Sequence, residues 1–185
     1  MEGLLSFKGI YPKIADDVYI APGAMVIGDV VIGSKSSIWF YTIVRGDVHF
    51  IRIGEETNIQ DHSMLHVTTD TFPLHIGNRV TVGHRAVIHG CTIADECLIG
   101  MGAIILDGAK IGKHSIVAAG TVVPPGMEVP ERSIVMGVPA KVQKQLTDED
   151  VARIVATAKH YVRLAEEYMK PKYLESDKIV RGFVR

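Results

Sequence analysis

A six-residue period governs residues 14–123 of this chain. An aliphatic residue opens each hexad, and a small or β-branched residue usually stands at its fifth position. Three extra residues precede Ile53, a longer insertion at residues 70–75 precedes Ile76, and the period shortens by one residue before Ile93. The hexads open at Ile14, Ile20, Val26, Ile32, Ile38, Val44, Ile53, Ile59, Leu65, Ile76, Val82, Ile88, Ile93, Ile99, Ile105, Ile111, Val117 and Val123.

A repeat of this length with short strands predicts a parallel β-helix, in which three hexads make one triangular coil and the aliphatic side chains stack inside the prism. Ordinary antiparallel strands are the alternative, but they would alternate with a period of two. Glycine at the second position is expected to serve tight corners with unusual dihedral angles. It stands there in six hexads, at Gly33, Gly54, Gly77, Gly83, Gly100 and Gly112.

The repeat places three histidines in a defined relation. The hexads at Leu65 and Ile88 form the third faces of adjacent coils, and His66 and His89 follow them directly. The two imidazoles should therefore stack about 4.8 Å apart, a spacing at which they can share a metal ion. His84 stands at the third position of the second face. It can reach the same point only if prisms pack around a threefold axis.

The same map places charged and polar residues around the histidines. Arg45 stands in the column of the two stacked histidines, one coil below, and Asp61 lies directly under His84. If His84 crosses a subunit interface, Asp61 should cross to Arg45 and form an intersubunit ion pair; the alternative is that both are solvated charges. Gln60 would point near the open metal position. The other five histidines are expected at the surface or in local packing: His49, His62, His75, His114 and His160.

Composition excludes several other classes of protein. The net charge is −1 with both signs mixed, so no nucleic-acid-binding surface is predicted. No apolar run is long enough to span a bilayer, and the first residues do not resemble a signal peptide. Cys91 and Cys97 imply no disulfide framework, which fits a reducing, cytoplasmic location; burial is preferred over metal ligation for both.

The chain is expected to divide into five parts: an N-terminal cap at residues 1–13, the β-helix at 14–127, an irregular connector at 128–146, a helix at 147–170 packed on a prism, and a tail at 171–185. Pro124 and Pro125 should end the repeat, since proline cannot donate to a strand ladder. Thr147 and Asp150 resemble a capping box, and apolar residues follow at helical spacing. The aromatic run at residues 39–41 is expected to pack at an interface.

Several motifs together closely resemble the γ-class carbonic anhydrases. They are Arg45-Gly46-Asp47, Asn58-Ile59-Gln60-Asp61, His66, His84-x4-His89-Gly90-Cys91-Thr92-Ile93, Leu98-Ile99-Gly100-Met101-Gly102-Ala103 and Gly137-Val138-Pro139-Ala140-Lys141. The resemblance implies an all-β fold, a left-handed parallel β-helix with a C-terminal α-helix, assembled as a homotrimer with one metal at each of three interfaces.

The resemblance also implies roles for individual residues. His66, His84 and His89 would be the metal ligands, with Zn²⁺ as the default ion and Fe²⁺ or Co²⁺ as alternatives. Gln60 would contact the metal-bound water, Arg45 and Asp61 would pair across the interface, Asp47 and Asn58 would support the site, and Tyr161 would approach it from the helix. The implied reaction is reversible hydration of carbon dioxide to bicarbonate by a metal-activated water.

One departure from the family pattern bears on the rate. Active members carry a glutamate directly after Arg-Gly-Asp and acids in the loop after the first ligand histidine, which move protons away from the metal. Here Val48 takes the first place, and the loop carries only Asp70. Slow turnover is therefore expected. Two alternatives stay open: an acyl-CoA thioesterase or acyltransferase, or a trimer whose metal has only a structural role.

Overall fold

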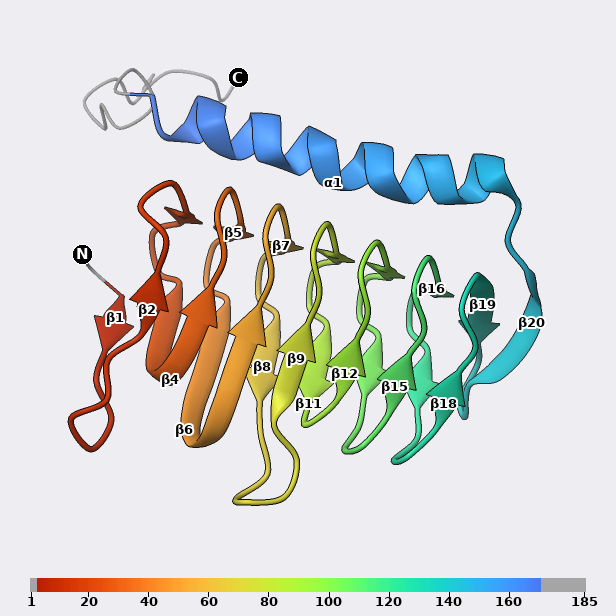
Figure 1. The fold of residues 1–185 in the computed structure, drawn as a ribbon, viewed down its shortest axis with the longest axis horizontal. Helices are drawn as coiled ribbons and strands as arrows, with labels where there is room; N and C mark the ends of the chain where they lie inside the picture. The colour runs from red at the N-terminus through yellow and green to blue at the C-terminus, as the bar shows by residue number, and fades with distance from the viewer. Residues whose placement is uncertain (1–2, 171–185) are drawn as a thin grey trace, which may run out of the picture.

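The computed structural model describes residues 3–170, which form a parallel β-helix flanked by one long helix (Figure 1). The first face of the prism includes the end of β4 (Met25–Ile32) and the end of β6 (Ile43–Ile53). Its other strands are β2 (Lys13–Ile14), β9 (Leu74–Ile76), β12 (Thr92–Ile93), β15 (Lys110–Ile111) and β18 (Glu128–Val129).

The second and third faces repeat the same stacking. The second is made of β3 (Tyr19–Ile20), β5 (Ser37–Ile38), β7 (Asn58–Ile59), β10 (Thr81–Val82), β13 (Leu98–Ile99), β16 (Ile116–Val117), β19 (Ser133–Met136) and the antiparallel β20 (Lys141–Gln145). The third begins with β1 (Leu4–Leu5) and the starts of β4 and β6, and continues with β8 (Met64–His66), β11 (Val87–His89), β14 (Ile104–Ile105) and β17 (Val122–Val123). This arrangement confirms the predicted fold class.

The hexad openers form the core. On the third face Val44 pairs with Leu65, Leu65 with Ile88, and Ile88 with Ile105, and all four side chains are fully buried. Each such burial contributes roughly 1.5–3 kcal/mol relative to an exposed side chain. The stacked aliphatic columns therefore fix the register of the parallel strands, including the strands that carry the histidines.

The glycines at the second position serve close packing rather than an unusual backbone. A Cβ added to Gly54 would lie 2.7 Å from the backbone of Gly77 in the next coil, so the coils could not approach. Left-handed φ angles occur two residues later, at non-glycine corner residues such as Glu56 (φ 53°) and Arg79 (φ 52°). The expectation of unusual dihedrals at the second-position glycines is therefore wrong.

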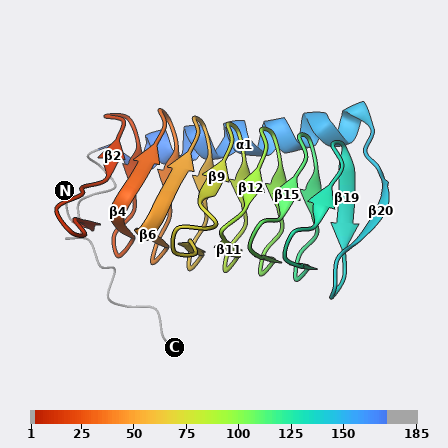
Figure 2. The ribbon, with the colours of Figure 1, turned by 60° about the horizontal axis from the view of Figure 1, so that its bottom comes forward.

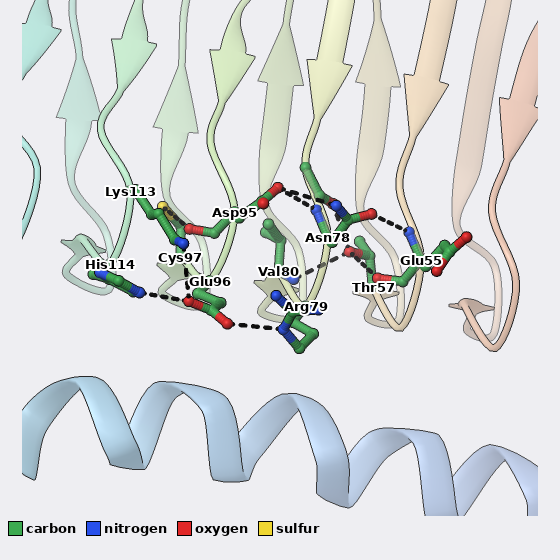
Figure 3. Close-up of polar contacts among 11 residues, drawn as sticks. Glu55, Thr57, Asn78, Arg79, Val80, Asp95, Glu96, Cys97, Lys113 and His114 are labelled. Carbon is green, nitrogen blue, oxygen red and sulfur yellow. Dashed lines mark hydrogen bonds and ion pairs between the residues drawn. The ribbon is translucent and has the colours of Figure 1, made fainter.

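Charged side chains link the corners between the first and second faces (Figure 3). Arg79 Nε donates to Glu96 Oε1 at 2.8 Å, and His114 Nε2 lies 2.5 Å from Glu96 Oε2. Burial raises the pKa of Glu96, but the hydrogen bonds from Arg79 and His114 outweigh burial and leave this pKa below its ordinary value. One carboxylate thus ties three successive coils together.

The repeat continues beyond the expected end of the β-helix. β18 pairs with β15 and β19 with β16, so Val129 and Val135 extend two of the core columns. Pro124 and Pro125 lie in the turn between β17 and β18 and do not stop the prism. Residues 128–146, expected as an irregular connector, contain three strands. The structure also brings residues of the expected N-terminal cap into the sheet, because Leu4 pairs with Val26.

Helix α1 (Asp148–Tyr168) runs back along the prism from its C-terminal end (Figures 1 and 2). Thr147 and Asp150 form the predicted capping box. The helix covers the second face of its own chain, where Trp39 is buried against Tyr161 and Tyr168. The interface expected for Trp39 is therefore wrong.

Within residues 3–170, no helix combines the length and the apolar character needed to cross a membrane. The predicted tail at residues 171–185 lies outside the described residues.

Candidate metal centre

His66 and His89 are direct partners on neighbouring parallel strands. β8 and β11 pair in the register Leu65↔Ile88 and His66↔His89, as the hexad map predicts. The ring centroids lie 5.1 Å apart, and Nδ1 of His66 lies 3.1 Å from Nε2 of His89. The repeat thus brings two imidazole nitrogens of one chain to a common point.

A carboxylate holds the other nitrogen of each ring. His66 Nε2 lies 3.0 Å from Asp47 Oδ1, and His89 Nδ1 lies 2.5 Å from Asp107 Oδ1. Because a carboxylate only accepts hydrogen bonds, these two nitrogens carry the protons. The lone pairs of His66 Nδ1 and His89 Nε2 then face each other, which is unfavourable unless a proton or a metal ion lies between them.

These nitrogens fit a tetrahedral metal ion. Two ligands at 2.0–2.1 Å from zinc are separated by about 3.3 Å, close to the distance found here. Histidine ligands commonly donate their second N–H to a carboxylate, as Asp47 and Asp107 allow. Burial lowers the pKa of His66, and nearby Arg45 lowers it further against the raising effect of Asp47. The neutral imidazole that ligation requires is therefore favoured.

The third predicted ligand lies elsewhere on the prism. His84 Nδ1 is 2.8 Å from Asp61 Oδ2, and the His84 side chain is 43% exposed. Within residues 3–170, no three His, Cys, Asp or Glu side chains come together in a way that could hold a metal ion. One chain thus supplies two nitrogens at a common point, and His84 is not among them.

Gln60 is buried at a hollow that also borders His84. It is 5% exposed, and its Nε2 donates to Asn58 Oδ1 at 3.1 Å. Asn58 is held in turn by its bond to Thr81 Oγ1, at 2.9 Å. The hollow measures about 250 Å³ and is also lined by Leu98, Ile99, Met101, Thr157 and Tyr161. Asn58 therefore orients Gln60 at the wall of this hollow.

Tyr161 reaches the same hollow from α1. Its ring packs edge-on against Trp39, with 5.6 Å between centroids. Burial raises the pKa of Tyr161, and the negative charge of Asp61 adds to this effect. The structure thus brings Gln60, His84 and Tyr161 together, although they come from three separate segments: Gln60 follows β7, His84 lies in the turn after β10, and Tyr161 is on α1.

Arg45 and Asp61 do not meet within one chain. Arg45 Nη1 bonds Asp47 Oδ2 at 2.5 Å, whereas Asp61 bonds His84. Burial raises the pKa of Asp47, but the hydrogen bonds from Arg45 and His66 bring this pKa below its ordinary value. The ion pair between subunits stays a prediction.

Asp70 lines a different hollow from the one beside Gln60. That hollow, of about 240 Å³, is bordered by Asp47, Val48, His49 and Asp70. The single acid of the inserted loop thus lies near Val48, on the side where His66 contacts Asp47.

Asp107 and Thr68 are site residues that the sequence interpretation missed. Asp107 accepts from His89 through one oxygen and from Thr68 Oγ1 through the other, at 2.8 Å. A usable signal existed: Asp107 is the third residue of the hexad opened by Ile105, one coil beyond Gly90. An acidic residue beside the histidine column could have been found from the same map.

Comparisons with known proteins place the chain in a family. A family profile described as bacterial transferase hexapeptide (six repeats) matches residues 11–46 and 90–125. Carbonic anhydrase from Geobacillus kaustophilus is 46% identical over 162 residues, which cover 88% of this chain and 88% of that protein. The chain belongs to the γ-class carbonic anhydrase family.

Two further relatives define how far this family relation extends. Gamma carbonic anhydrase 2, mitochondrial, from Arabidopsis thaliana is 47% identical over 160 residues, covering 84% of this chain. The chain spans only 58% of the length of that γ-class relative. A solved structure of a hexapeptide transferase family protein from Anaplasma phagocytophilum has a TM-score of 0.87 and 36% identity, covering 91% of this chain and 99% of that chain.

Proposed function

We propose that this protein hydrates carbon dioxide reversibly to bicarbonate at a metal site shared between subunits of a homotrimer. The facing pair of His66 Nδ1 and His89 Nε2, 3.1 Å apart, is the observation that carries the proposal. The names of the relatives from Geobacillus and Arabidopsis support the reaction.

His66 and His89 of one chain and His84 of a neighbouring chain would hold the metal. Zn²⁺ is the default ion, with Fe²⁺ or Co²⁺ as alternatives that histidine ligands also suit. A divalent ion held by neutral imidazoles supplies a Lewis acid that activates water near neutral pH. Asp47 and Asp107 keep the two stacked rings oriented for this role.

The walls of the hollow beside His84 would position the substrate. Gln60 presents a buried amide whose orientation Asn58 sets. Tyr161 adds a hydroxyl with a raised pKa, so it stays protonated and can donate a hydrogen bond. Both groups can therefore orient a small, weakly polar molecule without carrying charge.

A column of outward-facing apolar side chains supports assembly through the third face. The register aligns Ile43, Met64, Val87, Ile104 and Val122 beside the column of Arg45, His66 and His89. Ile43 and Val87 are each 36% exposed in the single chain. A second copy packed on this column would bury it and could bring His84 toward the histidine pair, and three copies would close a ring.

Turnover is proposed to be slow. Val48 stands where active members have a glutamate, and the loop after His66 carries only one acid, Asp70. Proton transfer to solvent would then depend on buffer.

Hydrolysis or transfer of an acyl thioester is the second candidate. It is favoured by the hollow of about 250 Å³, which offers more space than carbon dioxide requires. A purely structural metal in the trimer is the third candidate.

The two cysteines are free and buried, which fits our proposal of a reducing location such as the cytoplasm.

Metal content and carbon dioxide hydration, measured together on wild type and His89→Ala, test the proposal. We expect about one metal per chain in wild type, and loss of metal and hydration in His89→Ala. His75→Ala, which removes an exposed histidine on the first face, is the matched control and should keep both. Metal without hydration would move the function to the thioester candidate or a structural role, and acyl-CoA substrates would separate these two.

A further inference from the structure

Asp107 connects the inserted loop to a proposed metal ligand. One carboxylate oxygen lies 2.5 Å from His89 Nδ1, and the other accepts from Thr68 Oγ1 at 2.8 Å. Thr68 comes from the loop between β8 and β9, which extends from the edge of the prism opposite α1 (Figure 1). Both oxygens of the carboxylate are therefore engaged, one on each side.

The loop is firmly seated at this point. Thr68 and Phe72 form a backbone bridge, with Thr68 N donating to Phe72 O at 3.1 Å. A Cβ added to Gly90 would lie 2.3 Å from Asp107 Oδ1 and 2.7 Å from Phe72 Cβ. The loop and the carboxylate thus occupy the space that glycine leaves open beside His89.

We propose that Thr68 and Asp107 form a positioning relay that holds His89 in the tautomer whose Nε2 faces the metal. Thr68 locks the rotation of the carboxylate, and the carboxylate takes the Nδ1 proton of His89. This inference rests on the metal site proposed above. In this proposal the inserted loop orients a metal ligand through the hydroxyl of Thr68. It does not supply acids that move protons.

The relay predicts a graded loss of metal affinity. Outer-sphere partners of ligand histidines typically contribute about 10–100-fold in affinity, so Asp107→Ala should weaken Co²⁺ or Zn²⁺ binding by about that factor. Thr68→Val removes only the hydroxyl and should cause a smaller loss, which Thr68→Ser restores. Thr69→Val is the matched control, because Thr69 is exposed and its side chain has no part in the relay.

Competition with a chelator, using the whole chain in its native assembly, measures these affinities, and the Co²⁺ absorption spectrum reports ligand geometry. Thr68→Val should have no further effect in the Asp107→Ala background, since both act through one path. Wild-type affinity in Asp107→Ala, or an equal loss from Thr68→Val in both backgrounds, would overturn the relay.

Histidine ¹⁵N NMR on the metal-free protein separates failure of the relay from failure of the proposed function. We expect His89 to carry its proton on Nδ1 in wild type, and a mixture of tautomers in Asp107→Ala. The same mixture in wild type would overturn the relay. Absence of any metal binding by wild type, with the tautomer as expected, would reject the metal site and leave the relay as a structural contact.

Discussion

His66 and His89 face each other across a parallel strand pair, with 3.1 Å between Nδ1 of one and Nε2 of the other. Carboxylates hold both rings from behind, so their lone pairs point into the same space. In the proposed metal site this pair would supply two ligands, and the site would be incomplete without a ligand from outside the chain. Several expected outcomes depend on that incompleteness.

Mixing two inactive variants should restore part of the metal site. We expect each metal site to take His89 from one chain and His84 from its neighbour. A trimer of His84→Ala chains alone, or of His89→Ala chains alone, then has no intact metal site. A mixed trimer keeps one intact interface of three, so random mixing should recover roughly a quarter of wild-type metal. The measurement is metal content after co-refolding. Recovery of no metal would contradict a site shared across the interface.

Arg45→Ala should weaken the trimer, because Asp61 of the neighbouring chain would lose its proposed partner. Arg52→Ala is a close control: Arg45 and Arg52 are similarly exposed, at 35% and 36%, and each pairs with an aspartate of its own chain. Sedimentation on dilution should show dissociation of the first variant at higher concentration than wild type or Arg52→Ala. Equal dissociation of both variants would count against the interface register.

Glu96→Gln should reduce the acid sensitivity of folding. The pKa of Glu96 in the folded protein is lower than the ordinary 4.5. Between the two values the unfolded chain binds more protons, so stability falls as pH drops from 4.5 through the folded pKa. Urea unfolding from pH 7 to pH 3 should show a shallower decline in the variant. Glu128→Gln should change the slope less, because the ion pair of Glu128 with Lys110 is exposed and screened by solvent.

Both thiols should be unreactive in the folded protein. Burial raises the pKa of the Cys97 thiol to about 12 and also raises the pKa of Cys91, and the side chains are 0% and 2% exposed. Since the thiolate is the reactive form, a disulfide reagent should titrate no cysteine until the chain unfolds. Rapid modification of either thiol in native buffer would contradict their place in the core.

The hexad pattern was sufficient to predict the prism and the register of its histidines. A period of six leaves one inward position per strand, so the stacking of Leu65 on Ile88 carries His66 onto His89. The end of the repeat was harder to place. Pro124 and Pro125 suggested a stop, yet both lie in a turn, where no ladder hydrogen bond is lost.

The hexad pattern could not predict hydrogen-bond and packing partners that depend on the direction of a side chain. The hexad map could have placed Asp107 beside the histidine column, but it does not show that the side chain turns toward His89 Nδ1. Trp39 was assigned to an interface because nothing in the repeat shows that α1 folds back over the second face of its own chain.

The hexad pattern alone is enough to show which residues share a column, because aliphatic burial tolerates no slip in a period of six. The folded chain was needed to show which ring nitrogens face each other and which carboxylates hold them. Those choices depend on rotamers and on contacts between segments far apart, such as Thr68 with Asp107 and Tyr161 with Trp39, whose energies the repeat does not encode.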